Sequence, residues 1–133
     1  MFSRLKKQKQ KPEPSENKKE YLINGQQKVI LNSRGLVPAI LQDHKTNEIL
    51  HLGYMDRWAL DVSFSSNKVY LYRRSTGKIQ LFGENLNLTY VIRSARLHAN
   101  GRALVLGVQI IQEVAGQEAK IPGTSFVHHI KLV

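Results

Sequence analysis

The side chains best suited to binding an anion lie together in one short segment, with the sequence Arg73-Arg74-Ser75-Thr76-Gly77-Lys78. Guanidinium groups donate paired hydrogen bonds to phosphate or carboxylate oxygens, and a glycine-containing turn exposes backbone N–H groups that can do the same. We therefore take Arg73, Arg74, Ser75 and Lys78, together with Glu84, as candidate ligand-binding residues. A solvated, charged hairpin turn explains the same residues, so both interpretations stay open.

Groups that could bind a metal or act as a nucleophile are few. The chain has no cysteine, which excludes thiolate catalysis, disulfides and a Cys-built zinc site. Imidazole is a good zinc ligand, so His98, His128 and His129 could form an alternative site. Adjacent residues of a strand point to opposite faces, however, so His128 and His129 cannot both enter one site. We predict no catalytic residue, no metal and no cofactor, and interpret these histidines as half-buried polar strand residues.

Tyrosines and arginines are interleaved between residues 54 and 96 of the chain. The residues are Tyr54, Tyr70, Tyr72 and Tyr90 with Arg73, Arg93 and Arg96. RNA-binding proteins use this combination for base stacking and phosphate contacts. Aromatic residues on strands more often pack across the sheet, so RNA binding is kept as an alternative.

A basic charge balance extends over the whole chain. Its 133 residues include 20 Lys or Arg and 10 Asp or Glu, a formal charge of +10. Residues 1–20 are rich in Lys, Gln, Glu and Pro, which predicts a disordered basic arm before a single domain over residues 21–133. The positive charge favours anionic partners such as phosphorylated small molecules, RNA or acidic protein. Since no apolar run reaches the length of a membrane span, we expect a cytoplasmic protein without membrane contacts.

The spacing of apolar runs and turn residues predicts several strands and one main helix. Asp56 is a suitable N-cap for an amphipathic helix over residues 56–65. Strands are expected over residues 28–31, 36–41, 49–55, 69–74, 79–82, 88–97, 103–111 and 125–133, with hairpin turns at Asn24-Gly25 and Asn100-Gly101. The predicted fold class is α+β, a mostly antiparallel β-sheet with one main α-helix.

The last hundred residues, approximately, resemble the phosphoribosyl-AMP cyclohydrolases of histidine biosynthesis. The segment Gly35-Leu36-Val37-Pro38-Ala39-Ile40-Leu41-Gln42-Asp43 is similar to the Pro-containing strand that opens that family. Leu52-Gly53-Tyr54-Met55-Asp56 is similar to the family's Ala-Tyr-Met-Asn box. The resemblance implies the family's α+β fold and a homodimer, because the family builds its sites across a two-fold interface.

The residues that bind metal in this family are replaced. The family's Asp-Cys-Asp-Gly-Asp corresponds to His98-Ala99-Asn100-Gly101-Arg102, and Lys120 falls about where the first of two C-terminal Cys ligands would be. The resemblance implies that, in the family, the residues at these positions bind zinc and magnesium. Zinc lowers the pKa of a bound water from about 16 to about 7, so without its ligands the hydrolytic hydroxide is lost.

The family's substrate-binding box is kept only in part. Arg74, Ser75, Gly83 and Glu84 retain the family residue, whereas Phe82 replaces a lysine. The sequence therefore favours a divergent member, a pseudoenzyme or repurposed binder of a phosphorylated nucleotide-like or other polyanionic ligand. Two alternatives stay open. One is an active cyclohydrolase that opens the adenine ring of phosphoribosyl-AMP with an atypical metal site, and the other is a basic RNA- or protein-binding module.

Overall fold

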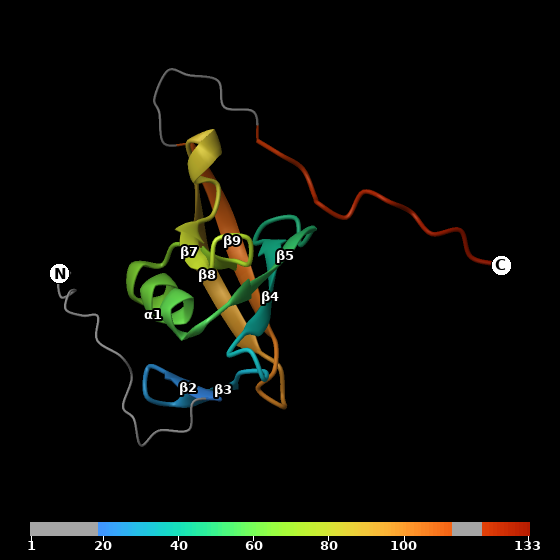
Figure 1. Cartoon of the computed structure of the whole chain (residues 1–133). Coiled ribbons are helices and arrows are strands. Elements are labelled where there is room, and N and C mark those ends of the chain that lie inside the picture. Colours follow the sequence, from blue (N-terminus) through green and yellow to red (C-terminus); the bar gives the residue numbers. More distant parts are fainter. Residues whose placement is uncertain (1–18, 113–120) are drawn as a thin grey trace.

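The computed structural model describes residues 19–112 and 121–133 as an α+β fold. Residues 1–18 of the predicted arm and Lys120 lie outside the described residues. The elements, in chain order, are β2 (Glu20–Ile23), β3 (Gln27–Ile30), β4 (Val37–Asp43), β5 (Ile49–Met55), α1 (Arg57–Ser66), β6 (Tyr70–Arg73), β7 (Lys78–Leu81), the short 3-10 helix η1 (Glu84–Leu86), β8 (Leu88–Leu97) and β9 (Leu104–Gln112) (Figure 1). The predicted fold class is confirmed.

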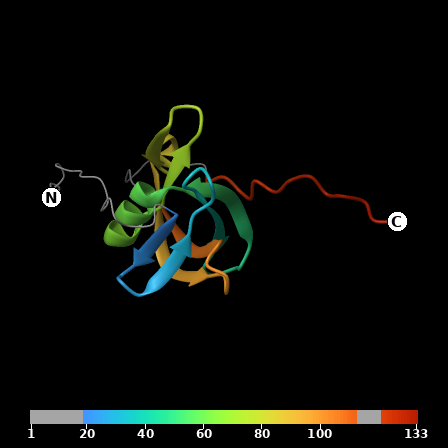
Figure 2. The ribbon, with the colours of Figure 1, turned by 60° about the horizontal axis from the view of Figure 1, so that its bottom comes forward.

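A curved four-stranded sheet with the order β5-β4-β9-β8 forms the centre of the fold (Figure 2). The pairs β4–β5 and β8–β9 are antiparallel hairpins, whereas β4 and β9 are parallel. The sheet is therefore mostly antiparallel, and its parallel pair joins segments that are far apart in the sequence. The inward-facing side chains of β4 and β9, among them Leu41 and Leu106, are fully buried.

Two smaller hairpins and the helix pack against this sheet. β2 pairs with β3 through a turn at Asn24-Gly25, where both residues have positive φ (53° and 70°), as a tight two-residue hairpin turn requires. β6 pairs with β7 and contributes buried Leu71 to the same core. The predicted Asn24-Gly25 turn and the β6–β7 hairpin are confirmed, whereas β2 was not among the predicted strands.

The helix α1 begins and ends where the sequence indicates. Asp56 precedes it, and its side chain accepts a hydrogen bond from Ala59 N at 2.8 Å. This bond satisfies one of the backbone donors that a helix leaves unpaired at its start. Asn67 ends the helix in the left-handed conformation, and buried Leu60 fixes the inward face. No helix among the described residues is long and apolar enough to cross a membrane.

The predicted strand over residues 125–133 is wrong. Ser125 N donates to Leu50 O at 2.7 Å, but the residues that follow form no ladder. The segment runs away from the folded body as an extended chain (Figure 1), and the side chains of Ile130 and Leu132 are exposed. Strand propensity becomes a strand only when a neighbouring strand supplies the hydrogen bonds, and here no described segment runs alongside.

Candidate ligand-binding site

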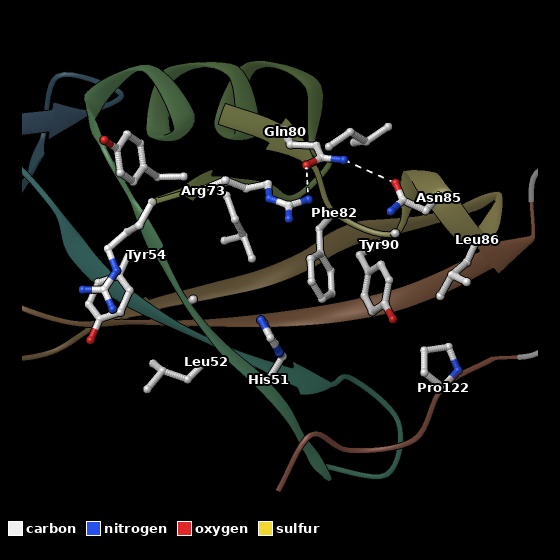
Figure 3. A pocket seen from close by; sticks show the side chains of 16 residues that line it. His51, Leu52, Tyr54, Arg73, Gln80, Phe82, Asn85, Leu86, Tyr90 and Pro122 are labelled. Atoms are coloured by element: carbon white, nitrogen blue, oxygen red, sulfur yellow. Dashed lines mark hydrogen bonds between the residues drawn. The ribbon is translucent and has the colours of Figure 1, made fainter. Parts of the chain in front are cut away.

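A cavity of about 540 Å³ lies between β5, the β6–β7 hairpin and the C-terminal segment (Figure 3). The C-terminal segment contributes Pro122, opposite the sheet. The aromatic residues that line the cavity are His51, Tyr54, Tyr72, Phe82 and Tyr90. The polar lining residues include Arg73, Arg74, Gln80 and Asn85. Such a volume is typical of sites for small molecules.

Three rings form a row along one wall of the cavity. His51 stacks on Phe82 with a centroid distance of 4.7 Å, and Phe82 meets Tyr90 edge to face at the same distance. The row results from the fold, because His51 shares the inward face of the sheet with its partner Leu41, and Phe82 N is tied to Val69 O at 2.9 Å directly after β7. We define these three side chains as the aromatic row. Stacked rings of this kind offer an apolar wall to a planar ligand.

Two neutral side-chain amides, linked to each other by a hydrogen bond, hold one guanidinium group at the cavity (Figure 3). Arg73 Nη1 donates to Gln80 Oε1 at 2.8 Å, and Gln80 Nε2 donates to Asn85 Oδ1 at 3.3 Å. Because Gln80 carries no charge, it orients Arg73 without neutralising it. The remaining donors of the guanidinium are therefore suited to an anion.

The structure separates the five candidate residues into two groups. Arg73 and Arg74 both line the cavity, since Arg74 follows the last residue of β6 and is not bound by strand alternation. Ser75 lies in the β6–β7 turn and Lys78 begins β7, and neither is among the lining residues. Glu84 begins η1 and is likewise not a lining residue, although Gly83 and Asn85 on either side are.

Sequence reasoning missed His51 as a site residue. It lies on β5 while Phe82 follows β7, so no local spacing brings the two rings together. The one available signal is the residue type at position 82, where Phe82 stands in place of the lysine of the resembling family. Of the tyrosines proposed for stacking, Tyr54, Tyr72 and Tyr90 line the cavity and Tyr70 does not.

His51 links the aromatic row to the C-terminal segment. Its Nδ1 lies 2.9 Å from Ser125 Oγ, next to the point where Ser125 N meets Leu50 O. Burial lowers the pKa of His51, because the charged imidazolium loses solvation between the sheet and the Phe82 ring. His51 is therefore favoured in its neutral form.

The lowered pKa of His51 predicts a loss of stability in mild acid. The unfolded chain holds the His51 proton more tightly than the folded chain, so this contribution is complete above about pH 6.5 and declines as the pH falls below it. We expect the free energy of unfolding to fall less steeply between about pH 7 and pH 5 in His51→Gln than in the natural chain. Urea unfolding at several pH values measures this. Parallel pH profiles of the two proteins would contradict it.

The residues at the positions of the resembling family's metal ligands do not fit a zinc ion. His98 Nδ1 accepts a hydrogen bond from Asn100 N at 3.1 Å, and Asn100 Oδ1 accepts one from Arg102 N at 2.9 Å. The first contact uses the lone pair of His98 Nδ1, and the second uses one of the two lone pairs of Asn100 Oδ1, in stabilising the turn. His128 and His129 lie exposed in the C-terminal segment. No group of three or more metal-binding side chains occurs within residues 19–112 and 121–133.

The scaffold, by contrast, has clear relatives. No protein-family model matches the chain. Phosphoribosyl-AMP cyclohydrolase from Pseudomonas savastanoi pv. phaseolicola is 38% identical over 84 residues, which cover 63% of this chain and 65% of the relative. The chain is homologous to the phosphoribosyl-AMP cyclohydrolases.

Two further phosphoribosyl-AMP cyclohydrolases match the chain at a similar level of identity. The protein from Stutzerimonas stutzeri is 36% identical over 84 residues, covering 63% of this chain and 64% of the relative. The protein from Halorhodospira halophila is 39% identical over 77 residues, covering 58% of this chain and 54% of the relative. The match to these cyclohydrolases thus spans less than two thirds of their length. The cysteine-free composition sets this chain apart from a zinc-binding cyclohydrolase site of the kind that the sequence resemblance implies.

Proposed function

We propose that the cavity binds a phosphorylated, nucleotide-like ligand and that the chain has lost zinc-dependent hydrolysis. The observation that carries this proposal is the position of the Arg73 guanidinium beside the aromatic row in one cavity. A nucleotide presents a flat apolar base and a phosphate a few ångströms apart. Rings and an un-neutralised guanidinium are the side chains that recognise these two parts.

The side chains present in the chain support the proposed loss of hydrolysis. Opening an adenine ring with water requires a strong nucleophile at neutral pH, which a zinc-bound water provides. The chain has no cysteine, and the His98–Asn100 turn uses its own polar atoms internally. Arg102 in the same turn adds a positive charge that disfavours a cation.

The binding proposal is tested by calorimetric titration of the full chain with AMP, adenosine and ribose 5-phosphate. We expect AMP to bind more tightly than either half of the molecule. Arg73→Ala should weaken AMP binding by about tenfold, since a charge-assisted hydrogen bond to the phosphate is lost. Lys78→Ala removes the same charge outside the cavity and serves as the matched control. Equal losses in both variants, or no binding of AMP, would overturn the proposal.

The names of the relatives favour a second candidate function, ring opening of phosphoribosyl-AMP with an atypical metal site. Elemental analysis of the purified chain, combined with a turnover assay on phosphoribosyl-AMP, separates the two. Turnover that rises with the zinc content would establish an enzyme and end the pseudoenzyme proposal. Protein without zinc and without turnover, but with AMP binding, would end the enzyme candidate.

We also propose that the chain forms a homodimer. The apolar side chains of Phe126, Val127, Ile130 and Leu132 are exposed, and a second copy is a partner that could bury them. The resemblance to a family with sites at a two-fold interface supports the same state. Light scattering should give twice the monomer mass, and a double substitution Ile130→Asp and Leu132→Asp should return it to the monomer mass. A monomeric natural chain would overturn this proposal.

A further inference from the structure

A second cleft, separate from the cavity, has an unusual set of polar side chains. It measures about 550 Å³ and lies between β8, the β2–β3 hairpin and the C-terminal end of α1. Its polar lining side chains are Asn24, Gln27, Asn67, Arg93, Ser94 and Arg96. Two of them are cationic, the other four are neutral, and none is acidic. A cleft of this composition attracts an anion that also offers hydrogen-bonding edges.

The cleft lies beside the C-terminal part of β8, beyond the point where the chain after α1 is hydrogen-bonded to the outer edge of this strand. Up to Ile92 the outer edge of β8 is bonded to the chain after α1, since Val69 N donates to Tyr90 O at 3.0 Å and Ile92 N donates to Asn67 O at 2.7 Å. The pairing of β8 with β9 then shifts register between Ile92 and Ser94, which leaves Arg93 as an extra residue in the strand. From this bulge onward, β8 is an edge strand of the four-stranded sheet, and its residues line the cleft.

Both arginines of the cleft are held by neutral partners. Arg93 Nε donates to Gln109 Oε1 at 2.8 Å, and Arg96 Nη2 donates to Gln42 Oε1 at 3.3 Å. Gln109 lies on β9 beside β8, and Gln42 lies on β4, one strand further across the sheet. The two amides hold the guanidinium groups and carry no charge of their own. An arginine fixed in this way loses less side-chain entropy when it binds a phosphate.

We propose that this cleft binds single-stranded nucleic acid. The phosphodiester backbone lies along Arg93 and Arg96, the side-chain amides of Asn24 and Gln27 hydrogen-bond to base edges, and the ring of Phe64 gives an unstacked base a stacking surface. A duplex hides the base faces that Phe64 would contact, so a single strand fits better. An acidic peptide could use the arginines and the amides, but its carboxylate side chains offer no planar base to the ring of Phe64.

Fluorescence anisotropy with labelled oligouridine and oligothymidine of roughly ten nucleotides tests the proposal on the full chain. We expect binding that weakens steeply from about 50 mM to about 200 mM KCl. Arg96→Ala should lower the affinity by about fivefold and reduce the salt slope by about one. Arg102→Ala, an exposed arginine of the neighbouring turn outside the cleft, is the control for a change in net charge. A difference between the two oligonucleotides distinguishes RNA from DNA as the ligand.

A second pair of variants separates the cleft from the general basic charge. Gln27→Glu places a carboxylate in the cleft, whereas Gln26→Glu adds the same charge to an exposed residue next to it that is not a lining residue. We expect several-fold weaker binding in the first variant than in the second, with unchanged thermal unfolding midpoints for both. Equal losses in both variants, affinity that does not respond to salt, or polyglutamate competing as well as unlabelled oligonucleotide would each overturn the proposal.

Discussion

Gly83→Ala is expected to destabilise the fold by about 2–4 kcal/mol and to disturb the cavity at the same time. Gly83 has φ of +87°, in the left-handed region where an alanine costs about 1–2 kcal/mol. A Cβ at this position would lie 2.8 Å from Tyr90 Cε1 and 3.0 Å from the backbone oxygen of Leu88. Since Tyr90 belongs to the aromatic row, its displacement also changes the wall of the cavity. Urea unfolding measures the loss of stability.

Gly35→Ala is the matched control for the backbone part of this effect. Gly35 has φ of +78°, but nothing lies within 4 Å of a Cβ built there. We expect this variant to lose only the conformational term, about 1 kcal/mol. Equal losses in the two variants would show that the contacts with Tyr90 and with the Leu88 backbone oxygen contribute nothing.

Most individual elements could be predicted from the sequence because their signals are local. The apolar runs of β4 and β5, the cap at Asp56 and the Asn24-Gly25 turn are each signals that lie within a few residues. The parallel pairing of β4 with β9 could not be predicted in this way, because it joins Ala39 to Leu104 across most of the domain. The strand predicted over residues 125–133 failed for the same kind of reason, since propensity does not supply a pairing partner.

The candidate site shows the same division between local and tertiary information. Arg73 and Arg74 were predicted from their residue types and from the turn that follows them, and both line the cavity. The contact between His51 and Phe82 depends on how β5 and the β6–β7 hairpin meet, which no spacing in the sequence reports. The role of Gln80 in holding Arg73 becomes visible only once β6 and β7 are paired.

Phe82→Ala is expected to weaken AMP binding by about 10- to 100-fold, if the base stacks on the aromatic row as proposed. Removal of a stacking ring costs about 1–3 kcal/mol per base. The effect should be large here because Phe82 is the central ring, in contact with both His51 and Tyr90 at 4.7 Å. Calorimetric titration with AMP and with ribose 5-phosphate gives the measurement. Affinity for ribose 5-phosphate, which has no base, should change little.

Phe82→Leu separates stacking from simple apolar burial, because leucine keeps the apolar character of the side chain and removes the ring. We expect this variant to bind AMP almost as weakly as Phe82→Ala while keeping more of the folding stability, since the neighbouring rings retain a packing partner. Full AMP affinity in Phe82→Leu would mean that the wall acts only by excluding water. A parallel loss of affinity for ribose 5-phosphate would instead place the effect on Arg73, whose guanidinium lies at the same cavity. Losses confined to AMP, as expected, would mean that Phe82, in place of the lysine of the resembling family, shifts recognition from the charged part of a ligand toward its planar part.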